Sequence, residues 1–85
     1  MKKELFISDK CSHCQNLMKK EKENPKYSND KDVEIINITE SMANLIRFLA
    51  YRDKLDGYKN AKENGKVGVP SMVIDEEKVE FIGEY

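Results

Sequence analysis

The sequence has few cysteines and no long apolar run. Its 85 residues include no tryptophan, one histidine, two prolines and two cysteines. After the basic start Met1-Lys2-Lys3, the apolar run Leu5-Phe6-Ile7 is too short for a secretory signal or a membrane span. We therefore expect a cytoplasmic protein with no membrane partner. In that compartment structural disulfides are rare, so a close cysteine pair favours catalysis, redox chemistry or metal binding.

An excess of either charge is also missing. Fifteen basic and sixteen acidic residues are interleaved and leave a formal net charge of -1. The basic cluster at residues 19–26 is interrupted by Glu21 and Glu23, which is typical of the wet face of a helix. We therefore expect no nucleic-acid partner. The apolar residues are grouped, and the length suits one domain, residues 1–85, with a single core.

The first half of the chain carries strand and helix patterns in alternation. Residues 3–7 and 32–38 are rich in apolar and β-branched residues, which predicts two strands. Between them, Cys14, Leu17 and Met18 recur at helical spacing, so a helix should begin near Ser12 and end before Pro25.

The second half repeats the helical pattern and then turns to strands. Met42, Leu45, Ile46 and Leu49 predict an apolar helix face behind a Ser41 cap, widened by Phe48 and Tyr51. Residues 58–64 predict a further turn or two of helix closed by Gly65. Residues 67–74 lead into a third strand, and residues 78–82 form a fourth after a turn at 75–77.

The resulting order is strand, helix, strand, helix, strand, strand. A helix between the first two strands normally gives a right-handed parallel crossover, and the last two strands form an antiparallel hairpin. The fold class expected is therefore α/β, a four-stranded mixed sheet with helices packed on it and no C-terminal helix.

The stretch Cys11-Ser12-His13-Cys14 holds both cysteines and the only histidine. By itself it is compatible with a redox pair, half of a metal site or two buried thiols. The disulfide-exchange nucleophile is a thiolate, and the start of a helix stabilises negative charge. Cys11 is thus predicted as the attacking thiolate and Cys14 as the resolving thiol. Lys10 and His13 are candidates for tuning the thiolate, or else solvated surface side chains.

Two motifs carry a family resemblance. A C-x-x-C between a first strand and a helix, and Gly68-Val69-Pro70 before the third strand, resemble the thioredoxin-like fold of the glutaredoxin type. Residues 46–70 are similar to a group of small bacterial glutaredoxin-related proteins. The resemblance implies a cis Val69-Pro70 bond beside the cysteines, and it assigns substrate binding to Val69, Pro70 and Gly83.

The activity implied is that of a thiol-disulfide oxidoreductase acting on protein disulfides or glutathione mixed disulfides. No cofactor is expected to be bound. Glutathione is one candidate electron donor and a thioredoxin reductase is the other. The chain departs from glutathione-dependent members, since it has Ser12-His13 within the pair, Lys10 directly before it and a single glycine, Gly83, near its end.

Two other readings stay open. One is a module that binds zinc, an iron-sulfur cluster or copper through the cysteine pair, completed by a partner, because Cys11, Cys14 and His13 fall short of four ligands. We expect no metal site within the chain itself. The other is a redox adaptor with weak catalysis.

Overall fold

The computed structural model describes residues 2–27 and 29–82 and contains the predicted succession of strands and helices. The elements are β1 (Lys3–Ile7), α1 (Ser12–Glu23), β2 (Val33–Asn37), α2 (Met42–Lys54), the short 3-10 helix η1 (Asp56–Tyr58), α3 (Lys59–Glu63), β3 (Ser71–Ile74) and β4 (Lys78–Phe81). Residues 58–64, expected to form further helical turns, contain α3, whereas η1 begins earlier, at Asp56, and overlaps that segment only at Tyr58. Gly65 follows α3 with a φ of 66°, a left-handed conformation that suits glycine.

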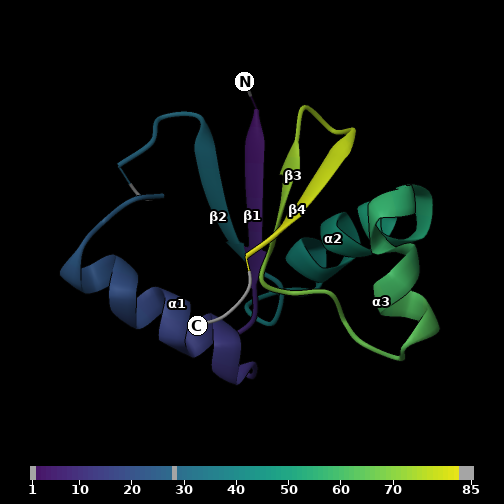
Figure 1. Ribbon diagram of the computed structural model, residues 1–85, viewed down its shortest axis with the longest axis horizontal. Helices are drawn as coiled ribbons and strands as arrows, with labels where there is room; N and C mark the ends of the chain where they lie inside the picture. Colours follow the sequence, from purple (N-terminus) through teal and green to yellow (C-terminus); the bar gives the residue numbers. More distant parts are fainter. Residues whose placement is uncertain (1, 28, 83–85) are drawn as a thin grey trace.

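The strands form one mixed four-stranded sheet in the order β2-β1-β3-β4 (Figure 1). β1 and β2 run parallel through the α1 crossover, and Leu5 is paired with Ile35. β3 runs antiparallel to β1 and to β4, and Val73 is paired with Glu4 on one side and Val79 on the other. The α/β class, the mixed sheet and the closing hairpin are therefore confirmed.

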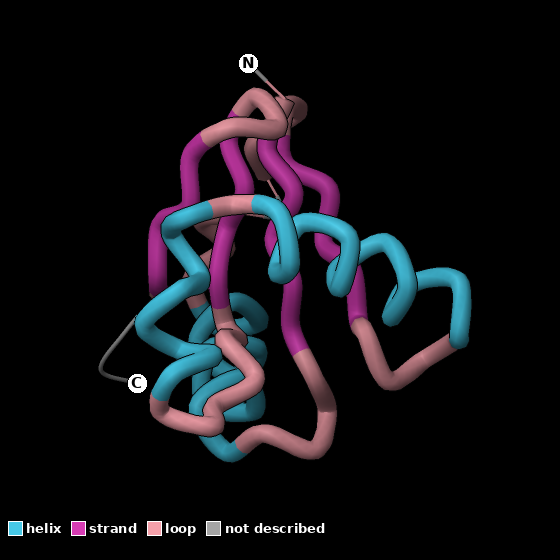
Figure 2. Tube along the Cα trace, turned by 90° about the vertical axis from the view of Figure 1, so that its right-hand side faces the viewer, coloured by secondary structure: helices cyan, strands magenta, loops and turns pink. Residues whose placement is uncertain are grey.

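The alternation of side chains along the strands builds a separate core on each face of the sheet. Leu5 and Ile7 point to one face, and Phe6 points to the other. The first core contains Leu5, Ile7, Cys14, Leu17, Met72 and Ile82, and the second contains Phe6, Ile36, Ile38, Phe48, Tyr58 and Val73. α1 therefore covers one face, while α2 and η1 cover the other, as the side view shows (Figure 2).

The buried face of α2 differs from the predicted one. Ser41 does cap the helix, since its side-chain oxygen accepts a hydrogen bond of 3.1 Å from the backbone N–H of Asn44. Phe48 is fully buried, however, whereas Met42 is 70% exposed and Ile46 is 61% exposed. Helical spacing predicts which side chains share a face but not how the helix is rotated against the sheet. Packing of Phe48 on Phe6, at 5.1 Å between ring centroids, decides that rotation.

A buried carboxylate in β1 links the sheet to α2. The Glu4 side chain is 1% exposed. It accepts hydrogen bonds of 3.0 Å from Arg47 Nε and 2.7 Å from the Tyr51 hydroxyl. Arg47 also donates two hydrogen bonds to the exposed Glu34 of β2. Arg47 and Tyr51 thus compensate the buried charge of the Glu4 carboxylate with hydrogen bonds, which a carboxylate in a protein interior requires.

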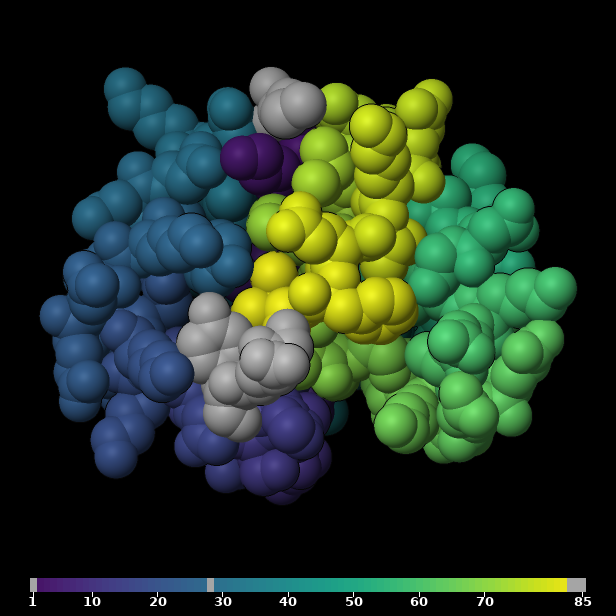
Figure 3. All heavy atoms as spheres, viewed as in Figure 1, coloured from purple at the N-terminus to yellow at the C-terminus, as the bar shows by residue number. Residues whose placement is uncertain are grey.

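Distant parts of the chain meet on the outside of the molecule. In the space-filling view, β4 lies between the α1 side and the side formed by α2 and α3 (Figure 3).

Within residues 2–27 and 29–82, no helix combines the length and apolar character needed to cross a membrane.

Candidate active site

Cys11 lies where the chain leaves β1 and enters α1. It is the N-cap residue of α1 and has an extended backbone, with a φ of -99°. Its N–H donates to the carbonyl oxygen of Ser8 at 3.2 Å, and its own carbonyl accepts from the N–H of Gln15 at 3.0 Å. The half-buried Cys11 side chain therefore lies at the helix terminus, where unpaired N–H groups favour negative charge. No acidic residue in the first turn opposes that effect.

The second motif lies directly against this thiol. Cys11 Sγ is 3.9 Å from the carbonyl oxygen of Val69 and donates a weak hydrogen bond to it. The Val69-Pro70 peptide bond is cis, as the resemblance implies. Gly68 precedes it with a φ of 103°, and a Cβ there would lie 3.1 Å from the Tyr58 ring. Glycine is therefore needed at position 68 for both conformation and space.

Cys14 lies one helical turn inside the domain and is only 1% exposed. It belongs to the core on the α1 face together with Leu17 and Met72. Burial raises the pKa of the Cys14 thiol to about 12. A hydrogen bond with the Ser8 backbone lowers this pKa, and the nearby Cys11 side chain raises it further. Cys14 therefore keeps its proton at neutral pH, while Cys11 is the thiol that meets the surface.

A groove of about 790 Å³ opens beside Cys11. Lys10, His13, Val69 and Pro70, which the sequence singles out, all line this groove together with Cys11. The side chains of Lys10 and His13 are exposed. The structure thus brings these five predicted residues together, with Cys14 directly behind. Gly83, the remaining predicted residue, lies outside the described part of the chain.

No family model, curated protein or solved structure matches this chain. The geometry of the groove is therefore what indicates its chemistry. Cys11 is a half-buried thiol at a helix N-terminus and lies beside a carbonyl group. Such a thiol can attack a sulfur atom of a disulfide and form a mixed disulfide. The second thiol behind it, Cys14, can then attack Cys11 and release the bound sulfur.

Several groove residues carry no signal in the sequence that would place them beside the cysteines. Thr39 comes from the loop after β2, Leu45 from α2, and Phe81 from β4. Lys66 and Val67 come from the loop after α3. They are single side chains from separated segments, so no motif joins them. Alternation along residues 78–82 does predict Phe81 on the same face as Val79, but not that it borders the cysteine.

One wall of the groove is held by an arginine of α2. Arg52 donates hydrogen bonds of 2.8 Å from Nε to the carbonyl oxygen of Val67 and 2.7 Å from Nη2 to that of Lys66. The backbone N–H of Lys66 also donates to the carbonyl oxygen of Ala61 at 2.8 Å. These contacts fix the loop that leads to Val69, so Arg52 positions the wall without reaching the thiol itself.

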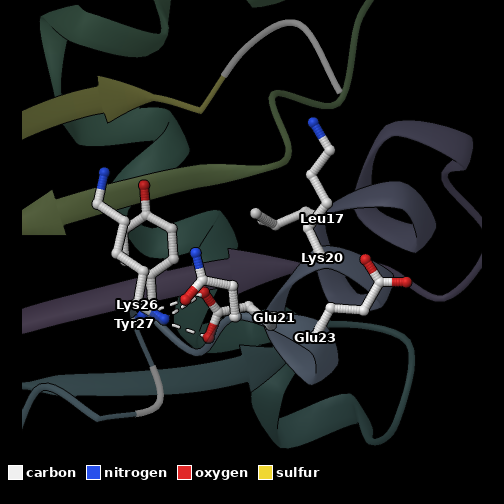
Figure 4. Close-up of a pocket in the computed structure, with 7 residues that line it drawn as sticks. Leu17, Lys20, Glu21, Glu23, Lys26 and Tyr27 are labelled. Atoms are coloured by element: carbon white, nitrogen blue, oxygen red, sulfur yellow. Dashed lines mark hydrogen bonds between the residues drawn. The ribbon is translucent and has the colours of Figure 1, made fainter.

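A second hollow, at the C-terminal end of α1, is lined by different side chains (Figure 4). Glu21 lies there and is buried, and its carboxylate accepts hydrogen bonds of 3.0 Å from the Lys26 N–H and 3.1 Å from the Tyr27 N–H. These bonds close the loop that follows α1. The buried Glu21 carboxylate is therefore explained by its role in holding this loop.

Cys14 borders a third hollow, of about 490 Å³, on the side of Met18 and Asn37.

Metal-ligating side chains do not gather at the cysteine pair. Across the described ranges, no three His, Cys, Asp or Glu side chains lie together in a way that could hold a metal ion. His13 lines the groove but does not complete a three-donor set with the two thiols. Among the described residues, the cysteine pair thus lacks the further donors that a four-coordinate metal site needs.

Proposed function

We propose that this chain is a thiol-disulfide oxidoreductase of the glutaredoxin type, within the thioredoxin-like superfamily. The observation that carries the proposal is the asymmetry of the two thiols. Cys11 is accessible at the start of α1 and faces Val69 across the groove, whereas Cys14 is buried behind it. The parallel β1 and β2, the closing hairpin and the cis Val69-Pro70 bond beside the cysteines support the fold assignment.

The reaction begins with attack of the Cys11 thiolate on one sulfur of a substrate disulfide. A new bond forms between Cys11 and that sulfur, the substrate S–S bond breaks, and the departing thiolate takes up a proton. Cys14 then loses its proton and attacks the Cys11 sulfur, which releases the second substrate thiol. Two electrons and two protons pass to the substrate, and the Cys11-Cys14 pair is left as a disulfide.

The raised pKa of Cys14 separates the two roles in time. Before attack, the buried Cys14 thiol stays protonated and does not compete with Cys11 for the substrate. Lys10 and His13 line the same groove as Cys11, close to where its sulfur reacts. Both are assigned a tuning role, and neither transfers electrons.

The oxidised pair has to be reduced again by a thiol donor. Glutathione and a thioredoxin reductase are the two donor systems proposed, and protein disulfides or low-molecular-weight disulfides are the substrates. Neither donor requires a cofactor held by this chain. We place the activity in the cytoplasm, where structural disulfides are rare and a close cysteine pair favours redox chemistry.

A steady-state assay tests the proposal. Wild type, Cys11→Ser and Cys14→Ser are given a glutathione mixed disulfide, a protein disulfide, and a thioredoxin reductase that re-reduces the oxidised protein. We expect turnover by wild type in at least one arm and none by Cys11→Ser. If wild type does not exceed Cys11→Ser in any arm, the enzyme proposal is lost and an adaptor role takes its place.

A further inference from the structure

Exposed apolar side chains line the Cys11 groove. Among the described residues, the large apolar side chains that stay exposed are Met42, Ile46, Val67 and Phe81, and Val67 and Phe81, at 53% and 48% exposure, line the groove. Leu45 of α2 lines it as well. Apolar side chains exposed in a groove mark an interaction site.

The described residues that line the groove include two cations and no carboxylate. The chain contains sixteen acidic residues, yet no Asp or Glu is among these lining residues, whereas Lys10 and Lys66 are. Asp9, beside Lys10, accepts a hydrogen bond of 2.6 Å from the neutral Thr39 hydroxyl and keeps its negative charge, so Lys66 is the cation on which the inference depends. Lys66 forms no ion pair with any carboxylate in the described ranges. The groove therefore complements a ligand that carries negative charge near Lys66.

The backbone beside Cys11 is also open to a ligand. Within the described residues, the N–H of Val69 has no hydrogen-bond partner, although its carbonyl oxygen accepts from Cys11. An unpaired backbone donor next to an apolar groove suits an extended peptide, which supplies a carbonyl oxygen at this position.

We infer that the groove binds an extended segment of a partner protein in which the disulfide cysteine is flanked by apolar side chains and by a carboxylate that pairs with Lys66. The inference rests on the proposed function and names its substrate class. The apolar flanks would cover Val67, Phe81 and Leu45. Glutathione also carries carboxylates, but it has no apolar side chain that would cover those three residues. The chemistry is the exchange described above, with the partner's disulfide reduced to two thiols while Cys11 and Cys14 form a disulfide.

The charge preference is tested with short peptides, each having one cysteine in a mixed disulfide with 2-mercaptoethanol. One peptide has leucines beside the cysteine and a glutamate next to them, and a second has lysine in place of the glutamate. Reduced wild type should react about two- to fivefold faster with the glutamate peptide, because one exposed ion pair is worth up to about 1 kcal/mol. Lys66→Glu should reverse this preference, and added salt should weaken it.

The matched control is Lys62→Glu, which makes the same charge change on an exposed α3 position outside the groove lining. It should leave the preference as in wild type. Equal effects of Lys66→Glu and Lys62→Glu on the ratio of the two rates would overturn the assignment to Lys66.

The apolar preference is tested with a third peptide, which has serines in place of the leucines, and with glutathione joined to the same leaving thiol. Burying one leucine side chain is worth about 1.5 kcal/mol, so the leucine peptide should react about tenfold faster than either. Equal rates for glutathione and the leucine peptide would contradict a protein substrate.

A binding measurement separates this inference from the redox proposal. The same peptides with serine in place of cysteine carry a fluorophore and are titrated with the full-length chain by fluorescence anisotropy. If the leucine-glutamate peptide binds more tightly than the lysine and serine peptides but no disulfide is turned over, the oxidoreductase proposal is lost and the docking surface stands. Turnover of the disulfides with no difference in rate or affinity among the peptides would keep the oxidoreductase and reject the docking surface.

Discussion

Arg52 of α2 donates a hydrogen bond of 2.8 Å to the carbonyl oxygen of Val67 and thereby ties a helix on the sheet face to the wall of the Cys11 groove. The second bond of the same guanidinium, to the carbonyl oxygen of Lys66, keeps two successive peptide units in place. The apolar Val67 and the cationic Lys66 are thus presented to the groove by a rigid backbone, although neither side chain is itself buried.

Replacing Arg52 by alanine should loosen this wall. Because loss of positioning lowers the rate of a reaction whose partners must be aligned, we expect the rate constant for reduction of a protein disulfide to fall about three- to tenfold. Alkylation of Cys11 by iodoacetamide should not change, since that reagent needs no groove. Arg52→Lys keeps the positive charge but loses the planar fork that reaches both carbonyl oxygens, and it should give an intermediate rate. A parallel loss in both reactions would point to the thiol itself and contradict a positioning role.

The two cysteines should differ strongly toward alkylating reagents. In the reduced native protein at neutral pH, Cys11 should take up iodoacetamide and Cys14 should not, because Cys14 is 1% exposed and its pKa is raised to about 12 by burial. Peptide mass spectrometry of the labelled protein gives the site. Cys11→Ser should remain unlabelled when native and take up one label when unfolded. Preferential labelling of Cys14 would reverse the assigned roles.

The reduced protein should lose stability at alkaline pH through Cys14. The folded state keeps the Cys14 proton up to a pKa of about 12, whereas the ordinary value is 9.0. This contribution is complete below pH 9 and is lost as the pH rises toward 12, with a slope of at most about 1.4 kcal/mol per pH unit. Denaturant unfolding under reducing conditions at a series of pH values measures it.

The control for that slope is Cys14→Ala. Burial also raises the pKa of Tyr58, so the alkaline loss is a sum over several groups. Cys14→Ala should be less stable than wild type near pH 7 because it leaves a cavity, yet its stability should fall less steeply above pH 9. Identical slopes for the two proteins would mean that Cys14 does not titrate in this way.

The buried Glu4 should depend on Arg47. Arg47→Ala leaves the Glu4 carboxylate without its nearest positive charge, so the free energy of unfolding should fall by about 3 to 5 kcal/mol. Chemical unfolding of the two proteins at pH 7 measures the loss.

Two variants complete the Glu4 experiment. Lys54→Ala, at an exposed position in the last turn of the same helix, should change stability by no more than about 0.5 kcal/mol. The double variant Glu4→Leu with Arg47→Met should recover most of the loss, because an apolar pair leaves no unpaired charge. If the double variant stayed as unstable as Arg47→Ala, the loss would come from packing rather than from an uncompensated carboxylate.

Local features of this protein were predictable from the sequence because their causes are local. Leu5 to Ile7 form a buried strand, Ser41 caps α2, and Gly65 ends α3, each through the chemistry of neighbouring residues. The order of elements then restricts the sheet to a parallel first pair and an antiparallel last pair. The placement of Cys11 at a helix start follows from the same periodicity.

The elements, their order and the cysteine motif at the start of α1 all follow from local sequence patterns. The surroundings of that motif depend on the packed domain. Phe48 rather than Met42 faces the sheet, Arg47 reaches Glu4 across 43 positions, and Lys66 and Phe81 both line the groove beside Cys11. The physical reason is that propensity and periodicity act over a few residues, whereas the rotation of a helix on a sheet and the walls of a groove depend on packing between distant segments.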